Sequence, residues 1–162
     1  MLYWRSMRAA DLPQVVELAA VVHHGLYERD AIYAERLALF PAGCLVLASA
    51  DSVEGYLLSH PIRPLQPPTL DTLLYELPVD ADAYYLHDLV VAPRHRGSGY
   101  AAAGVAKVLE LAQDFHTTSL IAVYGTQRFW QRFGFQTIPD VEAAKLATYG
   151  NHVTYMQRDN PR

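Results

Sequence analysis

One stretch in the second half of the chain constrains the fold more than any other. An apolar run at Tyr84–Val91 is followed by a turn with two glycines, Arg94–Gly99, and then by an amphipathic segment, Tyr100–Phe115. A second apolar run, Ser119–Tyr124, comes next. This order predicts strand, turn, helix and strand, and two strands joined through a helix are expected to be parallel. We therefore expect an α/β (α+β) protein.

The other elements follow from local patterns. Asp11 and Pro13 are typical of the start of a helix, and Gly134 is typical of the end of one. The prolines of the segment 61–82, five in number, predict a long ordered loop rather than a strand. Further strands are expected at Leu2–Met7, Cys44–Ala48, Val53–Leu58, Phe135–Thr137 and His152–Met156, and further helices at Arg29–Phe40, Thr126–Phe133 and, within the loop, Thr69–Leu77.

Composition excludes several classes of protein. The 162 residues are 51% hydrophobic and 19% charged, which suits one domain, 1–162, with a buried core. The net charge of −4 would repel a phosphate backbone, so we expect no nucleic-acid partner. Cys44 is the single cysteine, which excludes disulfides within the chain and cysteine-based metal sites. The sequence has no membrane-spanning run and no signal-peptide pattern, so we expect a cytoplasmic protein that does not bind membranes.

The two-glycine turn has the features of an anion-binding site. Backbone N–H groups at the start of the following helix are free to bind an anion, and the helix dipole favours one there. Gly97 and Gly99 would let the backbone approach the anion closely. Arg94 and Arg96 add charge and directional donors. A phosphate or pyrophosphate would suit such a turn, although a purely structural turn with two solvated arginines has the same sequence.

Two common nucleotide-binding motifs do not fit this turn. The segment Gly97-x-Gly99-x-x-Ala102 matches the loose dinucleotide pattern, but that pattern needs a carboxylate at the end of the next strand to hold a ribose. Here the next strand ends in Val123-Tyr124-Gly125. A P-loop is also excluded, because no Gly-Lys-Ser/Thr follows the glycines.

Several motifs together resemble the GNAT family of N-acetyltransferases. The turn fits the family pattern Arg/Gln-x-x-Gly-x-Gly/Ala through Arg94, Gly97 and Gly99. The segment Leu86–Pro93 resembles the family's fourth strand, and Phe129–Phe135 resembles its aromatic-pair helix followed by Gly-Phe. The resemblance covers nearly the whole chain. It implies a mixed, mostly antiparallel central sheet with one splayed parallel strand pair and helices on both faces.

The resemblance also implies an acetyl-CoA site. In the family the pyrophosphate lies on the amides of the turn, the pantetheine arm pairs with the backbone of the fourth strand, and the aromatic-pair helix lies along the cofactor. The implied contacts are Leu89, Val90, Val91, Arg94, His95, Arg96, Gly97, Ser98, Gly99, Tyr100, Ala101, Phe129 and Trp130.

Acetyl transfer requires a neutral amine, and deprotonating an alkyl ammonium at pH 7 costs roughly 4–5 kcal/mol, so a base is useful. His87 and Asp88 are the candidate bases, and His87 has the better ordinary pKa for the task. As neighbours on a strand they are expected to face opposite sides of the sheet, so at most one would point into the cleft. His60 and Glu76 are weaker candidates.

Trp130 departs from the family pattern. The family often has a tyrosine at this position, which protonates the leaving thiolate, and a tryptophan cannot act as an acid. Tyr124, Tyr149 or solvent could take over this role, and we include Tyr124 among the catalytic candidates. The neighbouring pair His23-His24 has poor spacing for a metal site, and no metal is expected.

Two functions are consistent with these features. The first is an acetyl-CoA-dependent N-acetyltransferase that acts on a primary amine of a small molecule or peptide by direct attack in a ternary complex. The second is a non-catalytic acyl-CoA-binding module with the same fold, which Trp130 favours. The acceptor pocket is expected to be built from the first two helices and the loop 61–82. Many members of the family are homodimers, so a homodimer is a further expectation.

Overall fold

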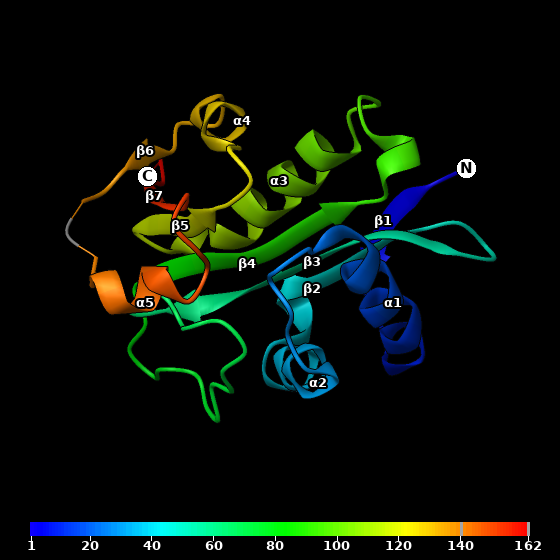
Figure 1. Ribbon diagram of the computed structural model, residues 1–162, viewed down its shortest axis with the longest axis horizontal. Helices are drawn as coiled ribbons and strands as arrows, with labels where there is room; N and C mark the ends of the chain where they lie inside the picture. The colour runs from blue at the N-terminus through cyan, green and yellow to red at the C-terminus, as the bar shows by residue number, and fades with distance from the viewer. Residues whose placement is uncertain (140, 162) are drawn as a thin grey trace.

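The computed structural model describes residues 1–139 and 141–161. Within this part of the chain, one seven-stranded sheet has the order β1-β2-β3-β4-β5-β7-β6 (Figure 1). All neighbouring strands are antiparallel except β4 and β5, which are parallel as predicted. The strands are β1 (Tyr3–Ser6), β2 (Cys44–Ala48), β3 (Val53–Ile62), β4 (Ala83–Val91), β5 (Thr117–Ala122), β6 (Gln136–Thr137) and β7 (Thr154–Asp159).

Helices cover both faces of the sheet, as the family resemblance implies (Figure 1). On one face α1 and α2 pack on a core that includes Val15, Ile32 and Tyr56. On the other face α3 and α4 pack on a second core that includes Val105 and Trp130. The helices are α1 (Leu12–Val22), α2 (Asp30–Leu39), α3 (Tyr100–Leu111), α4 (Gln127–Gln131) and α5 (Ala143–Ala147), with short 3₁₀ turns at Ala9–Asp11, Pro41–Gly43, Pro93–His95 and Ala112–Asp114. No helix in the described residues is long and apolar enough to cross a membrane.

The parallel strands stay together over only part of their length. Pairs between β4 and β5 run from Ala83 with Thr117 to Leu86 with Leu120. Beyond Leu86, β4 continues to Val91 without a partner on that side, while β3 still pairs with it on the other. The second half of β4 therefore presents an open backbone edge inside the molecule.

A β-bulge in β4 contradicts the expectation that His87 and Asp88 face opposite sides of the sheet. Leu58 of β3 lies opposite Asp88, but the next residue, Ser59, lies opposite Leu86, so His87 is an extra residue in its strand. Such an insertion interrupts the alternation of side chains. Both His87 and Asp88 consequently point to the face that α1 and α2 cover, and both line one cavity.

The proline-rich segment differs from expectation in two places. Pro61 belongs to β3 rather than to a loop, in a part of the strand that pairs with β4 but lies beyond the last pair with β2, which is at Leu58. The predicted helix at Thr69–Leu77 is absent. Asp71 and Tyr75 have positive φ angles of 58° and 65°, which break a helix.

Carboxylates replace the missing helical hydrogen bonds of this segment. The N–H groups of Leu74 and Tyr75 donate to the carboxylate of Glu35 on α2. The N–H of Asp71 donates to Glu28, which lies just before α2. The loop is thus held against the α1–α2 layer by acidic side chains distant in sequence.

Candidate active site

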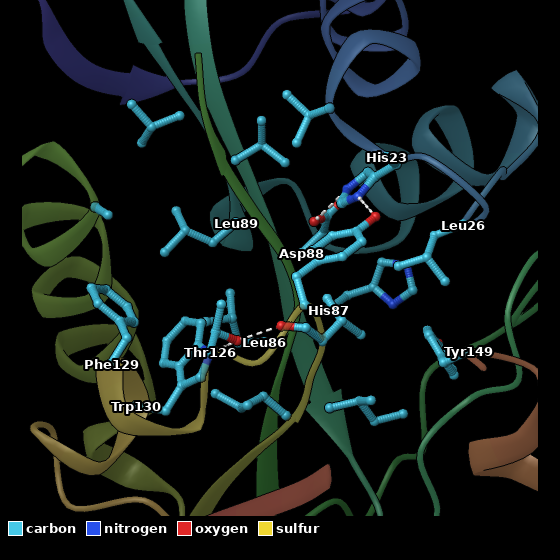
Figure 2. A pocket seen from close by; sticks show the side chains of 18 of the residues that line it. His23, Leu26, Leu86, His87, Asp88, Leu89, Thr126, Phe129, Trp130 and Tyr149 are labelled. Carbon is cyan, nitrogen blue, oxygen red and sulfur yellow. Dashed lines mark hydrogen bonds and ion pairs between the residues drawn. The ribbon is translucent and has the colours of Figure 1, made fainter. Parts of the chain in front are cut away.

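A cavity of about 700 Å³ opens where β4 and β5 part. Figure 2 shows Phe129 and Trp130 on one side of it and His23 and Leu26 on the other, with β4 passing between them. Its walls come from β4, from the end of α1, from the residues after β5 and from α4. Its lining is mainly apolar with a few convergent polar side chains, as in most small-molecule sites.

The two-glycine turn leads directly into this cavity. Gly97 and Gly99 have φ angles of 82° and 83°, which side chains other than glycine adopt only with strain. In the described part of the chain, no backbone N–H of residues 97–102 donates to another residue. Arg96 and Ala101 line the cavity. The turn thus combines free donors, a helix N-terminus and a cation beside an open space.

Arg94 does not point into the cavity. It donates to the carboxylate of Glu54 on β3, and its side chain remains 69% exposed. His95 also lies near Glu54. The backbone adds a further tie, since the N–H of Ala92 donates to the carbonyl of Glu54. In this structure Arg94 therefore anchors the turn to β3, whereas Arg96 is the arginine that lines the cavity.

The aromatic pair forms one wall of the cavity. The rings of Phe129 and Trp130 meet edge to face with centroids 4.9 Å apart. The Trp130 indole N–H donates to the hydroxyl of Thr126, 3.2 Å away, just before α4. This contact holds the indole in place but leaves it no transferable proton.

His87 lines the cavity, but its imidazole is almost fully enclosed by neighbouring side chains. Its Nε2 lies 2.8 Å from Oε1 of Glu28, and its side chain is only 2% exposed. Its Nδ1 is buried without a hydrogen-bond partner among the described residues. Burial would raise the pKa of Glu28, but the neighbouring His87 and the N–H of Asp71 outweigh burial and lower the pKa to about 2. Glu28 is therefore a carboxylate at neutral pH.

Asp88 belongs to a more accessible network. Its carboxylate accepts a hydrogen bond of 2.6 Å from the hydroxyl of Tyr56 on β3 and lies 2.9 Å from Nε2 of His23. Nδ1 of His23 lies 3.0 Å from the hydroxyl of Tyr124, and the two rings stack. Side chains from α1, from β4 and from the segment after β5 thus meet in one chain of hydrogen bonds.

This network shifts the pKa values of its members. Burial lowers the pKa of His23, but the hydrogen bond and charge of Asp88, with the charge of Glu28, raise it more, so the net pKa lies above the usual 6.5. Burial and the charge of Asp88 raise the pKa of Tyr124, which is therefore a neutral hydroxyl at pH 7.

Tyr124 has an unusual backbone. Its φ angle of 55° lies in the left-handed region, and Gly125 follows with 71°. Strain of this kind in a non-glycine residue often marks a functional position. Here it turns the chain just after β5 and directs the hydroxyl back toward His23.

Of the remaining candidates, His60 and Glu76 do not line the cavity, and Tyr149 lines it with its hydroxyl already bonded. His60 is buried beside Tyr85, and burial lowers its pKa to about 3. Glu76 is exposed in the loop. The hydroxyl of Tyr149 donates to the carbonyl of Pro68, and burial raises the pKa of this tyrosine. Tyr124 is thus the freer of the two candidate tyrosines.

Two members of the site, His23 and Glu28, are not among the site residues predicted from the sequence. In the sequence, His23 stands out only through its neighbour His24, and the spacing of this pair is poor for a metal site. Its partners Asp88 and Tyr124 lie 65 and 101 positions away, so no local spacing could connect them. Glu28 belongs to no motif in the sequence, yet it is buried in the structure.

The chain belongs to the acetyltransferase (GNAT) family. The family model matches residues 6–135, which include the two-glycine turn, both parted strands and the aromatic pair. No curated protein matches the sequence at a significant level.

Solved structures share the fold at low sequence identity. The loading GNATL domain of CurA from Lyngbya majuscula is 13% identical, with 98% of each chain covered and a TM-score of 0.80. Ard1 from Thermoplasma volcanium is 17% identical, with 99% of each chain covered and a TM-score of 0.71. Naa50 from Arabidopsis thaliana, solved with the bisubstrate analogue CoA-Ac-MVNAL, is 15% identical, with 97% of each chain covered and a TM-score of 0.71.

Proposed function

We propose that this protein is an N-acetyltransferase that transfers an acetyl group from acetyl-CoA to a primary amine of a small molecule or peptide. The observation that carries the proposal is the cavity between the parted strands, with an open β4 edge on one side and unpaired N–H groups of the turn at its end. An open strand edge can pair with the amides of an extended thioester, and free N–H groups can bind its pyrophosphate.

The residues of the turn and of β4 would bind acetyl-CoA. The N–H groups of residues 97–102 and the guanidinium of Arg96 would hold the pyrophosphate. The unpaired edge of β4 at Leu89–Val91 would pair with the amides of the pantetheine arm, and Phe129 and Trp130 would pack along it. A β4 N–H on this edge would polarise the thioester carbonyl.

The other half of the cavity would take the amine. His24, Leu26 and Leu70 come from the α1–α2 connection and the loop 63–82, where we expected the acceptor to bind. The amine would attack the thioester carbon directly, so that the new C–N bond forms while the C–S bond breaks. Of the two residues considered as bases, Asp88 is better placed to take part in proton transfer, because Glu28 holds the imidazole of His87.

Acetyl-CoA is expected to raise the unfolding temperature, and NAD is not. At about 100 times its dissociation constant a ligand adds roughly 2.7 kcal/mol, which is a shift of several degrees for a domain of this size. Thermal unfolding with each compound measures the effect. If acetyl-CoA produces no shift at millimolar concentration, the proposed function is wrong.

Release of free CoA thiol separates the enzyme from the non-catalytic acyl-CoA-binding module. The binding module stays a candidate because Trp130 occupies the place of the family's acidic tyrosine. An N-acetyltransferase releases thiol when an accepted amine is added. A protein that is stabilised by acetyl-CoA but releases no thiol across a broad panel of amines and peptide N-termini would be a binder.

A further inference from the structure

His23 lies directly after α1, and its imidazole makes polar contacts with two other segments of the chain. The α1 helix ends at Val22, and the chain leaves it with φ and ψ of −89° and 87° at His23. This geometry places the imidazole between Asp88 of β4 and Tyr124 after β5, in the opening between the two strands. Both ring nitrogens are within hydrogen-bond distance of a titratable group, and His23 and Asp88 each keep 11% of their side-chain surface exposed in the cavity.

The hydrogen bonds determine which nitrogen of His23 carries the proton. The hydroxyl of Tyr56 donates to Asp88, so the carboxylate acts as an acceptor. A carboxylate can only accept from Nε2, and Nε2 must therefore carry a hydrogen. In neutral His23, Nδ1 is then an acceptor for the Tyr124 hydroxyl, and in the imidazolium it is a donor to the same oxygen.

We propose that His23 is a positioning residue that exchanges a proton with Tyr124, and that Asp88, His23 and Tyr124 form a proton relay for acetyl transfer. The proposal rests on the acetyl-transfer function proposed above. It assigns the role of acid to Tyr124, whose hydroxyl reaches the cavity, and it supplies the partner that a tyrosine needs to give up and recover its proton.

Over one turnover, each relay residue recovers every proton that it gives up. As the amine nitrogen bonds to the acetyl carbon, it passes a proton to the Tyr124 oxygen, while the hydroxyl proton of Tyr124 moves to Nδ1 of His23. Asp88 stabilises the resulting imidazolium. When the C–S bond breaks, Tyr124 gives its proton to the thiolate sulfur and recovers one from His23. The products are the amide and CoA thiol, and the relay returns to its starting state.

The surroundings of His23 support this exchange. Two carboxylates face it, Asp88 from β4 and Glu28 from the α1–α2 connection, and together they favour the imidazolium. Further titratable groups close to the network are the hydroxyls of Tyr124, Tyr56, Tyr33 and Tyr149 and the imidazole of His87, which contacts Glu28. The pKa of His23 lies above 6.5, and its neutral, proton-accepting form is gained as the pH rises through that pKa.

The test measures how the kcat/KM of wild type, divided by that of a His23 variant, depends on pH. We expect kcat/KM of wild type divided by that of His23→Gln to rise with pH and to level off at about 10²-fold above the pKa of His23. The ionisation of the amine cancels in the ratio, because both enzymes meet the same acceptor. Glutamine can still donate to Asp88, but it cannot titrate. A role of His23 in structure alone would give a ratio that is independent of pH.

Two further variants complete the kinetic test. Tyr124→Phe should show the same pH-dependent ratio. The kcat/KM of the double variant should be at most about threefold below that of the less active single variant, because the two residues act as one unit. His152→Gln is the matched control, since His152 is exposed and does not line the cavity, and its ratio should stay near one. A flat ratio for His23→Gln, or additive losses, would overturn the relay.

Imidazole NMR tests the relay without turnover. In the wild type we expect the Nε2–H form of His23 and a pKa above 6.5, which falls in Asp88→Asn. Tyr124→Phe should move the Nδ1 signal. An Nδ1–H form, or an Nδ1 signal that does not respond to Tyr124→Phe, would overturn the relay even if acetyl-CoA binds. Lack of stabilisation by acetyl-CoA would instead overturn the proposed function, so the two failures are distinguishable.

Discussion

Gly97→Glu is expected to abolish acetyl-CoA binding, with a loss of affinity of at least about 100-fold, while the protein still folds. A side chain at Gly97 would meet nothing within 4 Å, so it would not clash with the protein. It would instead extend from the turn whose free N–H groups are proposed to bind the pyrophosphate. A carboxylate there repels the phosphates and competes for their donors, and like charges at a binding site cost several kcal/mol.

Gly97→Gln is the matched control for this variant. Both substitutions place a side chain of one shape on a backbone with a φ of 82°, so both carry the same strain, about 1–2 kcal/mol. Their unfolding temperatures without ligand should agree. Isothermal titration with acetyl-CoA should then show a much larger loss for glutamate than for glutamine. Unchanged affinity in Gly97→Glu would show that the pyrophosphate does not bind at this turn.

Glu28→Gln is expected to cost about 3 kcal/mol of unfolding free energy at neutral pH. The carboxylate of Glu28 is buried and joins His87 of β4 to the N–H of Asp71 in the long loop. Its pKa is about 2 in the folded protein and 4.5 as the ordinary value, and each pKa unit corresponds to about 1.4 kcal/mol. Glu28→Ala should cost more, because it also leaves a hole beside His87.

The loss of unfolding free energy in Glu28→Gln is also expected to depend on pH. A carboxylate with a lowered pKa in the folded state stabilises the protein fully above its unfolded pKa of 4.5, and this contribution is lost as the pH falls toward 2. The difference between wild type and Glu28→Gln in urea unfolding should therefore shrink between pH 5 and pH 3. Glu110→Gln, at an exposed position of α3, should differ from wild type by less than about 0.5 kcal/mol throughout. A difference that does not change with pH would contradict the assignment of a buried, ionised Glu28.

Much of the fold could be predicted because its signals are local. The apolar run before Val91, the glycines of the turn and the amphipathic pattern of α3 lie next to one another, and together they predict the parallel pair of β4 and β5. The turn and the aromatic pair also have recognisable motifs. The cavity contains both, with Arg96 and Ala101 from the turn region and Phe129 and Trp130 from α4.

The polar centre of the site could not be predicted, because it depends on contacts between distant segments. The bulge at His87 is a property of the pairing with β3, and a single strand carries no sign of it. The strand rule therefore placed His87 and Asp88 on opposite faces. The loop 63–82 shows the same limit, since the carboxylates of Glu28 and Glu35 take the N–H groups that a helix would have used.

The bulge in β4 has a consequence for how the site tolerates sequence change. A substitution at Leu89, Val90 or Val91 alters one wall position and leaves the direction of its neighbours intact. Loss of the single extra residue at His87 would restore regular alternation with Asp88 still opposite Leu58, and it would remove the contact between β4 and Glu28. Variation in this strand should therefore be common in the identity of the residues and rare in their number, since the extra residue supplies the imidazole that contacts Glu28.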